Sequence, residues 1–155
     1  MLHILIFCKP SCTKGVSNLN VENVMSREVA TCNPLDYINE VANQMRTLDI
    51  GCLPVVNNNK LVGIVTDRDI VTRAVAKDSQ SKVEDVMTKS VITVSPSDTT
   101  VEASDIMAEN QVRRLPVVEN DKLVGFVSLA DLAFPFPHVQ EISNALESIS
   151  EPRHY

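Results

Sequence analysis

Two aspartates follow a hydroxyl residue at the same spacing in two distant parts of the chain. Thr66 stands three residues before Asp69, and Ser128 stands three residues before Asp131. An ionised carboxylate can accept hydrogen bonds from two adjacent hydroxyls of a ligand, and such charge-assisted bonds contribute about 1.5–3 kcal/mol each. The alternative is that both pairs are ordinary helix caps, which use the same residue types to receive the free amides of a first helical turn.

Each of these pairs closes one copy of an internal repeat. The first copy reads GCLPVVNNNKLVGIVTDRDIV from Gly51, and the second reads RRLPVVENDKLVGFVSLADLA from Arg113, at a constant offset of 62 residues. Further upstream, VENVM recurs as VEDVM, and the motif T-x-x-P occurs at 31–34 and again at 93–96. Units of this size bury a continuous core only when they stack, so the two copies are expected to pack together.

Both copies predict the same elements. LPVV and KLVG followed by IV or FV are apolar runs of strand length, and the residues between them, 57–59 and 119–121, supply turn chemistry. The glycines in KLVG, Gly63 and Gly125, indicate a bulge or a close backbone approach. A helix precedes LPVV, and we expect Asp36 to cap it. Its core-facing residues are Ile38, Val41, Ala42, Met45 and Leu48.

The element order per copy is therefore strand, helix, strand, strand, helix. This order predicts an α/β (α+β) fold in which two β-α-β-β-α repeats pack through their sheets with pseudo-twofold symmetry. We expect an N-terminal extension at 1–15, a first domain at 16–76 and a second at 77–136. Prolines in FPFPH then stop regular structure, and an amphipathic helix at 141–150 follows within the tail 137–155.

Composition argues against several functions. The chain has 155 residues and a net charge of −6, which disfavours nucleic-acid binding. Its apolar start, MLHILIFC, is too short to span a membrane and makes a poor signal peptide. The four cysteines have neither the density nor the spacing of a disulfide framework. We therefore expect a cytoplasmic protein with free thiols and no membrane partner.

Catalysis and metal binding are also disfavoured. The three histidines, His3, His138 and His154, lie near the chain ends and outside the repeats. The four glycines form no phosphate-binding loop, and no nucleophile sits in a recognisable elbow. Cys8 and Cys12 form a single CxxxC without a second ligand pair. We expect no enzyme activity, no catalytic residues and no metal site.

Together the motifs resemble a tandem pair of CBS (cystathionine β-synthase) domains, called a Bateman module. The resemblance covers roughly Val21 to Ala133 and rests on VMS/VMT, T-x-x-P, LPVV, GIVTDRD and GFVSLAD. It implies two related clefts between the copies. It further implies that the clefts bind adenosine-containing ligands, as in many family members, and that the protein dimerises into a flat disc.

The resemblance also implies which residues line the clefts, since each takes its closing aspartate from one copy and its T-x-x-P and pre-LPVV residues from the other. The first cleft would contain Thr31, Pro34, Ile50, Gly51, Ser128, Ala130 and Asp131. The second would contain Thr66, Arg68, Asp69, Thr93, Pro96, Val112 and Arg113. The aspartates would hold a ribose, aliphatic residues would flank the base, and Arg113 would face a phosphate.

Two functions remain open. One is a stand-alone sensor that binds AMP, ADP, ATP or S-adenosylmethionine, needs no further cofactor and signals as a homodimer to a separate regulated protein. The alternative is a structural dimerisation module without a ligand. Gly51 and Cys52 in the first copy stand where the second has Arg113 and Arg114, so the two clefts are expected to differ in affinity or ligand.

Overall fold

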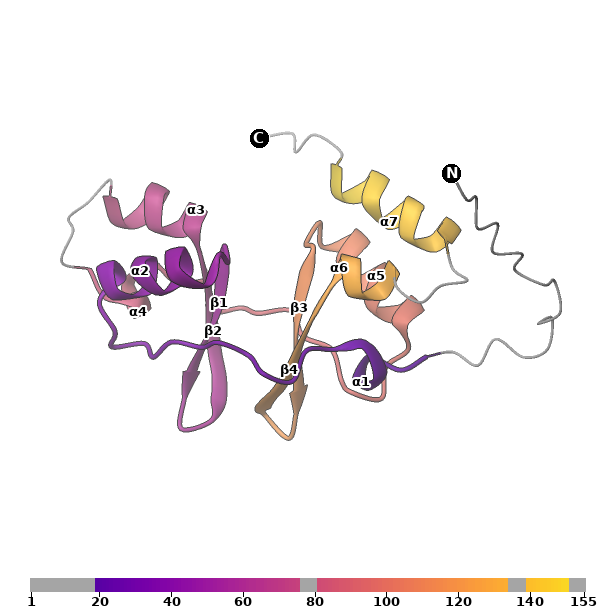
Figure 1. The fold of residues 1–155 in the computed structure, drawn as a ribbon, viewed down its shortest axis with the longest axis horizontal. Helices are drawn as coiled ribbons and strands as arrows, with labels where there is room; N and C mark the ends of the chain where they lie inside the picture. Colours follow the sequence, from indigo (N-terminus) through magenta and orange to yellow (C-terminus); the bar gives the residue numbers. More distant parts are fainter. Residues whose placement is uncertain (1–18, 76–80, 134–138, 151–155) are drawn as a thin grey trace, which may run out of the picture.

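The protein is described by a computed structural model that covers residues 19–75, 81–133 and 139–150. The extension, the Cys8–Cys12 pair and FPFPH lie outside these residues. The fold is mixed α and β, and it consists of two halves that follow the sequence repeat. Figure 1 shows the two β-hairpins at the centre, with α2, α3 and α4 on one outer side and α5, α6 and α7 on the other.

Each half is built on one antiparallel hairpin. In the first half β1 (Cys52–Asn57) pairs with β2 (Lys60–Thr66), and in the second half β3 (Arg114–Glu119) pairs with β4 (Lys122–Ser128). A single pairing between the first residues of β2 and β4 joins the hairpins into one sheet of order β1-β2-β4-β3. The LPVV and KLVG runs are strands, as the sequence predicted.

The hairpin turns are two residues long. Asn58 and Asn59 have φ angles of 50° and 63°, and Asn120 and Asp121 have φ angles of 50° and 64°. Two consecutive left-handed residues match the twist of the flanking strands, and asparagine and aspartate tolerate this conformation better than other non-glycine residues. The predicted turn chemistry of NNN and END is thereby confirmed.

Helices cover the outer side of each hairpin. α2 (Ile38–Leu48) and α5 (Thr100–Glu109) precede the hairpins. After β2 the chain forms α3 (Asp67–Asp69), which continues as the π-helix η1 (Ile70–Val75), and after β4 it forms α6 (Leu129–Ala133). The C-terminal helix α7 (Val139–Ser150) packs against α5 and α6 and buries Ala145, so the prediction of a final amphipathic helix is confirmed.

Two expectations about α2 need correction. Asp36 does not cap the helix, because its Oδ2 accepts a hydrogen bond from the Asn33 amide at 2.7 Å and closes the turn before it. Leu48 does not face the core either, since it is the last residue of the helix and is 48% exposed. Ile38, Val41 and Met45 are buried as expected.

The two halves exchange their first segments. α1 (Val21–Val24) belongs by sequence to the first copy, yet Val21 is fully buried in the core of the second half. α4 (Val83–Val86) belongs to the second copy, and Val83 is fully buried in the core of the first half. Figure 1 shows the indigo α1 beside β4 and α4 among the helices of the first half, where it contacts η1. Each core therefore contains a segment from the other copy.

Backbone hydrogen bonds fix the exchanged segments onto the strands. Ser26 and Phe126 of β4 exchange bonds of 2.9 Å in both directions. Thr88 and Ile64 of β2 make the equivalent pair, with the Thr88 amide donating at 2.9 Å and the Ile64 amide at 3.0 Å. Where the sequence predicted a first strand in each copy, the structure has only a single parallel bridge. In the first half this bridge joins Cys32 to β1.

The glycines in KLVG make this exchange possible. A Cβ on Gly63 would lie 2.6 Å from the Met87 sulfur and 3.1 Å from the Thr88 carbonyl oxygen. Gly125 stands in the same relation to the sulfur of Met25. The register of each hairpin also shifts next to the glycine. Both sequence readings of these glycines, a bulge and a close backbone approach, are therefore correct.

Candidate functional site

A cleft of about 300 Å³ lies where the two halves meet, against residues 26–30 of the first copy, which we call the crossing segment. This volume is at the lower end of the range for small-molecule sites. The crossing segment lines the cleft because its bonds to β4 carry it across the second hairpin. The apolar lining comes from both halves and comprises Val29, Ala30, Leu48, Ile50, Pro54 and Phe126.

Arg114 brings a positive charge to this cleft. It begins β3 at the position that Cys52 holds in β1, and both residues line the cleft. Burial raises the pKa of the Cys52 thiol, the charge and hydrogen bond of Arg114 oppose that rise, and Asp67 adds to it. The thiol is therefore protonated at neutral pH, and the guanidinium is the group suited to an anionic ligand.

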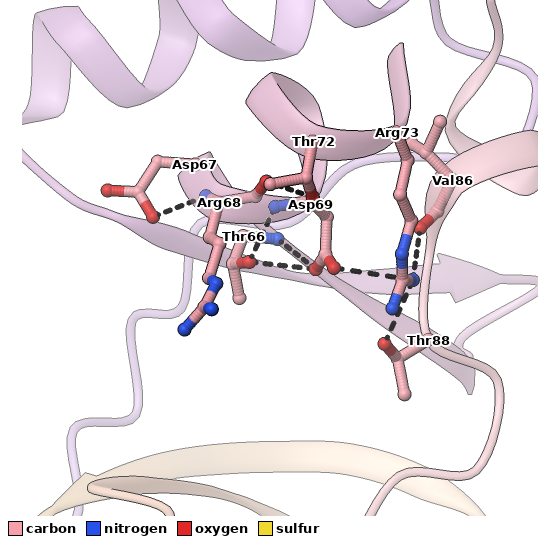
Figure 2. Close-up of polar contacts among 8 residues, drawn as sticks. All are labelled: Thr66, Asp67, Arg68, Asp69, Thr72, Arg73, Val86 and Thr88. Atoms are coloured by element: carbon pink, nitrogen blue, oxygen red, sulfur yellow. Dashed lines mark hydrogen bonds and ion pairs between the residues drawn. The ribbon is translucent and has the colours of Figure 1, made fainter. Parts of the chain in front are cut away.

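Asp69 is part of a closed network (Figure 2). Its Oδ2 accepts hydrogen bonds from the Thr66 amide at 3.0 Å and the Thr66 hydroxyl at 2.7 Å, and the Asp69 amide donates back to that hydroxyl at 3.1 Å. Its Oδ1 forms an ion pair of 3.3 Å with Nη1 of Arg73. The same nitrogen donates to the Val86 carbonyl oxygen at 2.8 Å and lies 3.5 Å from the Thr88 hydroxyl.

Asp131 repeats only part of this arrangement. Its Oδ2 accepts from the Ser128 amide at 2.8 Å and from the Ser128 hydroxyl at 2.7 Å. No donor among the residues that the structure describes reaches its Oδ1. Ser128 is also the strand partner of Arg114, which lines the cleft. The capping interpretation thus applies to both aspartates, but only Asp131 keeps a whole oxygen available.

Ile50 and Gly51 of the first predicted cleft line the observed one, together with residues of the second half. A hydrogen bond from the Asp67 amide to the Gly51 carbonyl oxygen, of 3.0 Å, holds this corner in place. The remaining residues predicted for this cleft are not among its lining residues; they are Thr31, Pro34, Ser128, Ala130 and Asp131.

The residues predicted for the second cleft are less well gathered. Thr66 and Asp69 are hydrogen-bonded, whereas Arg68 points away from the Asp69 carboxylate in Figure 2. The side chains of Thr93 and Arg113 are exposed, and Val112 packs against the core of the second half. Pro96 is half-buried, and its carbonyl oxygen accepts the Glu22 amide of the exchanged segment at 3.0 Å.

Sequence reasoning missed the crossing segment and the role of Arg114. Ala30 and Phe126 line the same cleft because the first segment of one copy pairs with the last strand of the other. No local sequence pattern predicts that exchange. Arg114 did carry a signal, since it replaces Cys52 at the equivalent position of the repeat. The structure places Arg114 in the cleft lining, whereas Arg113 is not part of it.

Within the described ranges, no group of three or more histidine, cysteine, aspartate or glutamate residues is arranged to hold a metal ion. Over the same part of the chain, no helix has the length and apolarity needed to cross a membrane.

Comparison with known proteins agrees with this architecture. The CBS domain family matches residues 21–76 and 83–134. The CBS domain-containing protein YhcV of Bacillus subtilis (strain 168) is 38% identical over 133 residues, which span 84% of this chain and 95% of that protein.

Two solved structures that resemble the chain contain ligands. One is the CBS domain pair of protein MJ0100 in complex with 5-methylthioadenosine and S-adenosyl-L-methionine, with a TM-score of 0.68, 28% identity and coverage of 76% of this chain and 94% of that one. The other is CBSX2 in complex with AMP, with a TM-score of 0.65, 26% identity and coverage of 73% and 92%. The matched repeats, the paired hairpins and these relatives lead to one conclusion: the chain belongs to the CBS domain family and carries two CBS domains in tandem.

Proposed function

We propose that this chain is a regulatory module that binds an adenosine-containing ligand in the cleft between its halves and transmits that state to a separate partner protein. The observation that carries the proposal is an aliphatic cleft with a cation in its lining, combined with an aspartate, Asp131, that keeps one oxygen without a partner among the described residues. Asp131 is connected to the cleft through Ser128, the strand partner of Arg114. AMP, ADP, ATP and S-adenosylmethionine are the ligands to test, and the ligand-bound structures of two relatives support this choice.

The cleft lining and Asp131, whose partner Ser128 pairs with Arg114 in the sheet, suit different parts of such a ligand. Ala30, Ile50 and Pro54 provide aliphatic walls for a flat base, since aromatic residues are scarce in this chain. Oδ1 of Asp131 can accept two ribose hydroxyls, and Arg114 can bind a phosphate or carboxylate. Binding would act by differential affinity for two arrangements of the halves, without a chemical step. We therefore assign the module no catalytic residues and no required cofactor.

The proposal is tested by thermal unfolding in the presence of increasing AMP, ADP, ATP or S-adenosylmethionine. A ligand of the native state raises the melting temperature progressively with its concentration. Asp131→Ala should weaken binding at least about tenfold, which corresponds to about 1.4 kcal/mol. Asp105→Ala removes the same charge from an exposed position on α5 and serves as the control. If millimolar concentrations of all four ligands leave the melting temperature unchanged, the proposal is wrong.

The second candidate is a structural dimerisation module without a ligand, and the exposed helical face of the first half favours it. Leu48, Val71 and Val75 are 48%, 63% and 71% exposed there, beside a groove of about 440 Å³ between α2 and η1. In the second half, α7 covers the equivalent face on α5 and α6. We expect a homodimer through the uncovered face. Light scattering that finds the same dimer with and without nucleotide, together with no measurable binding, would favour this candidate over the sensor.

A further inference from the structure

The two closing aspartates differ in how much hydrogen-bonding capacity they leave for a ligand. A carboxylate offers about four lone-pair positions. Asp131 uses two of them, both on Oδ2 and both for Ser128. Asp69 uses three, because Arg73 also occupies Oδ1. Two adjacent ribose hydroxyls need two positions, so Asp131 can bind them as it stands, whereas Asp69 can bind them only if Arg73 leaves.

Arg73 is held in place by more than the ion pair. Its Nη1 donates to the Val86 carbonyl oxygen at 2.8 Å, so the side chain also ties η1 to the exchanged α4 (Figure 2). The Asp69 side chain is only 13% exposed. The Arg73 side chain is 49% exposed, so the pair is shielded from water mainly on its carboxylate side. A ligand at Asp69 would therefore have to break this ion pair and release the Val86 carbonyl as well. The equivalent position in the second copy is Pro135, which carries no side-chain donor.

The residues expected to line the two sites also differ in size, and the larger one belongs to the site of Asp69. Ala30 of the crossing segment lines the observed cleft, and its equivalent in the second copy is Ile92, a much larger residue. Ile92 is 38% exposed, so its side chain is not withdrawn into a core. The site that depends on Asp69 therefore combines an occupied carboxylate with a bulkier wall.

We infer that Arg73 reserves Asp69 as a structural anchor, so that each chain holds a single adenosine-containing ligand, the one bound through Asp131. By pairing with the Asp69 carboxylate, Arg73 determines which of the two related sites accepts a ligand, and it is a specificity-determining residue for that reason. This inference rests on the proposed function, since it concerns how many of the two related sites are open.

Equilibrium dialysis and native mass spectrometry with AMP, ATP and S-adenosylmethionine measure the number of ligands per chain. We expect one per chain in the wild type and none in Asp131→Asn. Arg73→Met removes the donor but keeps the aliphatic length, and it should raise the number from one to two. Arg73→Lys keeps a cation, and Thr72→Ala changes the neighbouring side chain but leaves the Asp69–Arg73 pair intact, so both should stay at one. A merely structural defect could not increase the number of ligands bound.

Other outcomes separate the two claims. A wild type that binds two ligands, or an Asp131→Asn variant that keeps one, overturns the inference while the proposed function stands. A wild type that binds none overturns the proposed function and the inference with it. If Arg73→Met melts like the wild type but still binds one ligand, Arg73 does not reserve Asp69. If that variant fails to fold, the count in Asp131→Asn still tests whether the Asp69 site is closed, and a count of one overturns the inference.

Discussion

At the scale of single residues, two adjacent arginines have different surroundings. Arg114 begins β3, lines the cleft and lies beside the Cys52 thiol, whereas Arg113 precedes the strand and is not among the lining residues, although both arginines are exposed. Strand alternation sends neighbouring side chains in opposite directions, so one residue of register decides which arginine meets a ligand. The sequence could show that the pair differs from Gly51 and Cys52, but it could not show which member faces the cleft.

We expect Arg114→Met to weaken the binding of AMP and ATP more than tenfold while changing the binding of adenosine little. The physical reason is that the guanidinium contacts the charged part of the ligand and not the base. Arg113→Met removes the same charge one residue earlier and is the matched control. Calorimetric titration of both variants with all three ligands checks this. Equal losses in the two variants would mean that only the overall charge matters.

Cys32 offers a second residue-scale prediction. Burial, with a smaller contribution from Asp36, raises the pKa of its thiol from 9.0 to about 12. Between these pH values the Cys32 thiol loses its proton in the unfolded chain but keeps it in the folded protein. The contribution of this thiol to the free energy of unfolding is therefore fully present below pH 9 and is lost as the pH rises towards 12. One such proton changes the free energy of unfolding by at most about 1.4 kcal/mol per pH unit.

The matched substitution is Cys32→Val, because Val94 holds the equivalent buried position in the second copy. We expect the variant to lose less stability than the wild type between pH 9 and pH 11, measured by urea unfolding at each pH. At pH 7 the two proteins should be similar in stability. Parallel pH profiles for the two proteins would show that the Cys32 thiol does not titrate in this range.

At the scale of elements, the hairpins were predictable and the exchange of segments was not. Apolar runs of strand length around NNN and END specify a hairpin locally, and the helical spacing before LPVV specifies α2. The exchange depends on contacts between residues far apart in sequence, such as Ser26 with Phe126. The only local sign of the exchange was the glycine in each KLVG. It predicted that some backbone approaches closely there, but not which segment does so.

Gly63→Ala tests that close approach. The new Cβ would meet the Met87 sulfur at 2.6 Å and the Thr88 carbonyl oxygen at 3.1 Å. Because the Thr88 contact is to backbone, we expect a loss of about 1–3 kcal/mol, measured by chemical denaturation. Gly51→Ala is the control, since its nearest neighbour is the Asp67 side chain at 3.1 Å, which can rotate away. If both variants are equally stable, the exchanged segment does not lie tightly on β2.

At the scale of the whole molecule, the exchange makes the two halves depend on each other. Val21 and Val83 are equivalent in the repeat, and each is fully buried in the half opposite to its own copy. Each segment is part of the core of one half and is covalently connected to the other half. Removing it would therefore expose that core and also detach the two halves from each other. The molecule should therefore unfold as one cooperative unit, although its sequence reads as two.

We expect Val21→Ala and Val83→Ala each to lower the stability by about 2 kcal/mol, because each truncates a fully buried valine. Both variants should keep a single transition in differential scanning calorimetry, with the calorimetric and van't Hoff enthalpies equal. Two separated transitions, with Val21→Ala shifting only one of them, would contradict the dependence of the halves on each other.

The exchanged segments also bear on how such a chain could have arisen. A single ancestral copy with this architecture would have had no partner for its own first segment, and its KLVG strand would have lacked the segment that now covers its glycine. Two identical copies trading these segments would satisfy both needs, and the present bridges, Ser26 with Phe126 and Ile64 with Thr88, are the contacts such a symmetric pair would make. Gene duplication and fusion would then have joined an existing homodimer into one polypeptide, after which Arg73 and Pro135 were free to diverge.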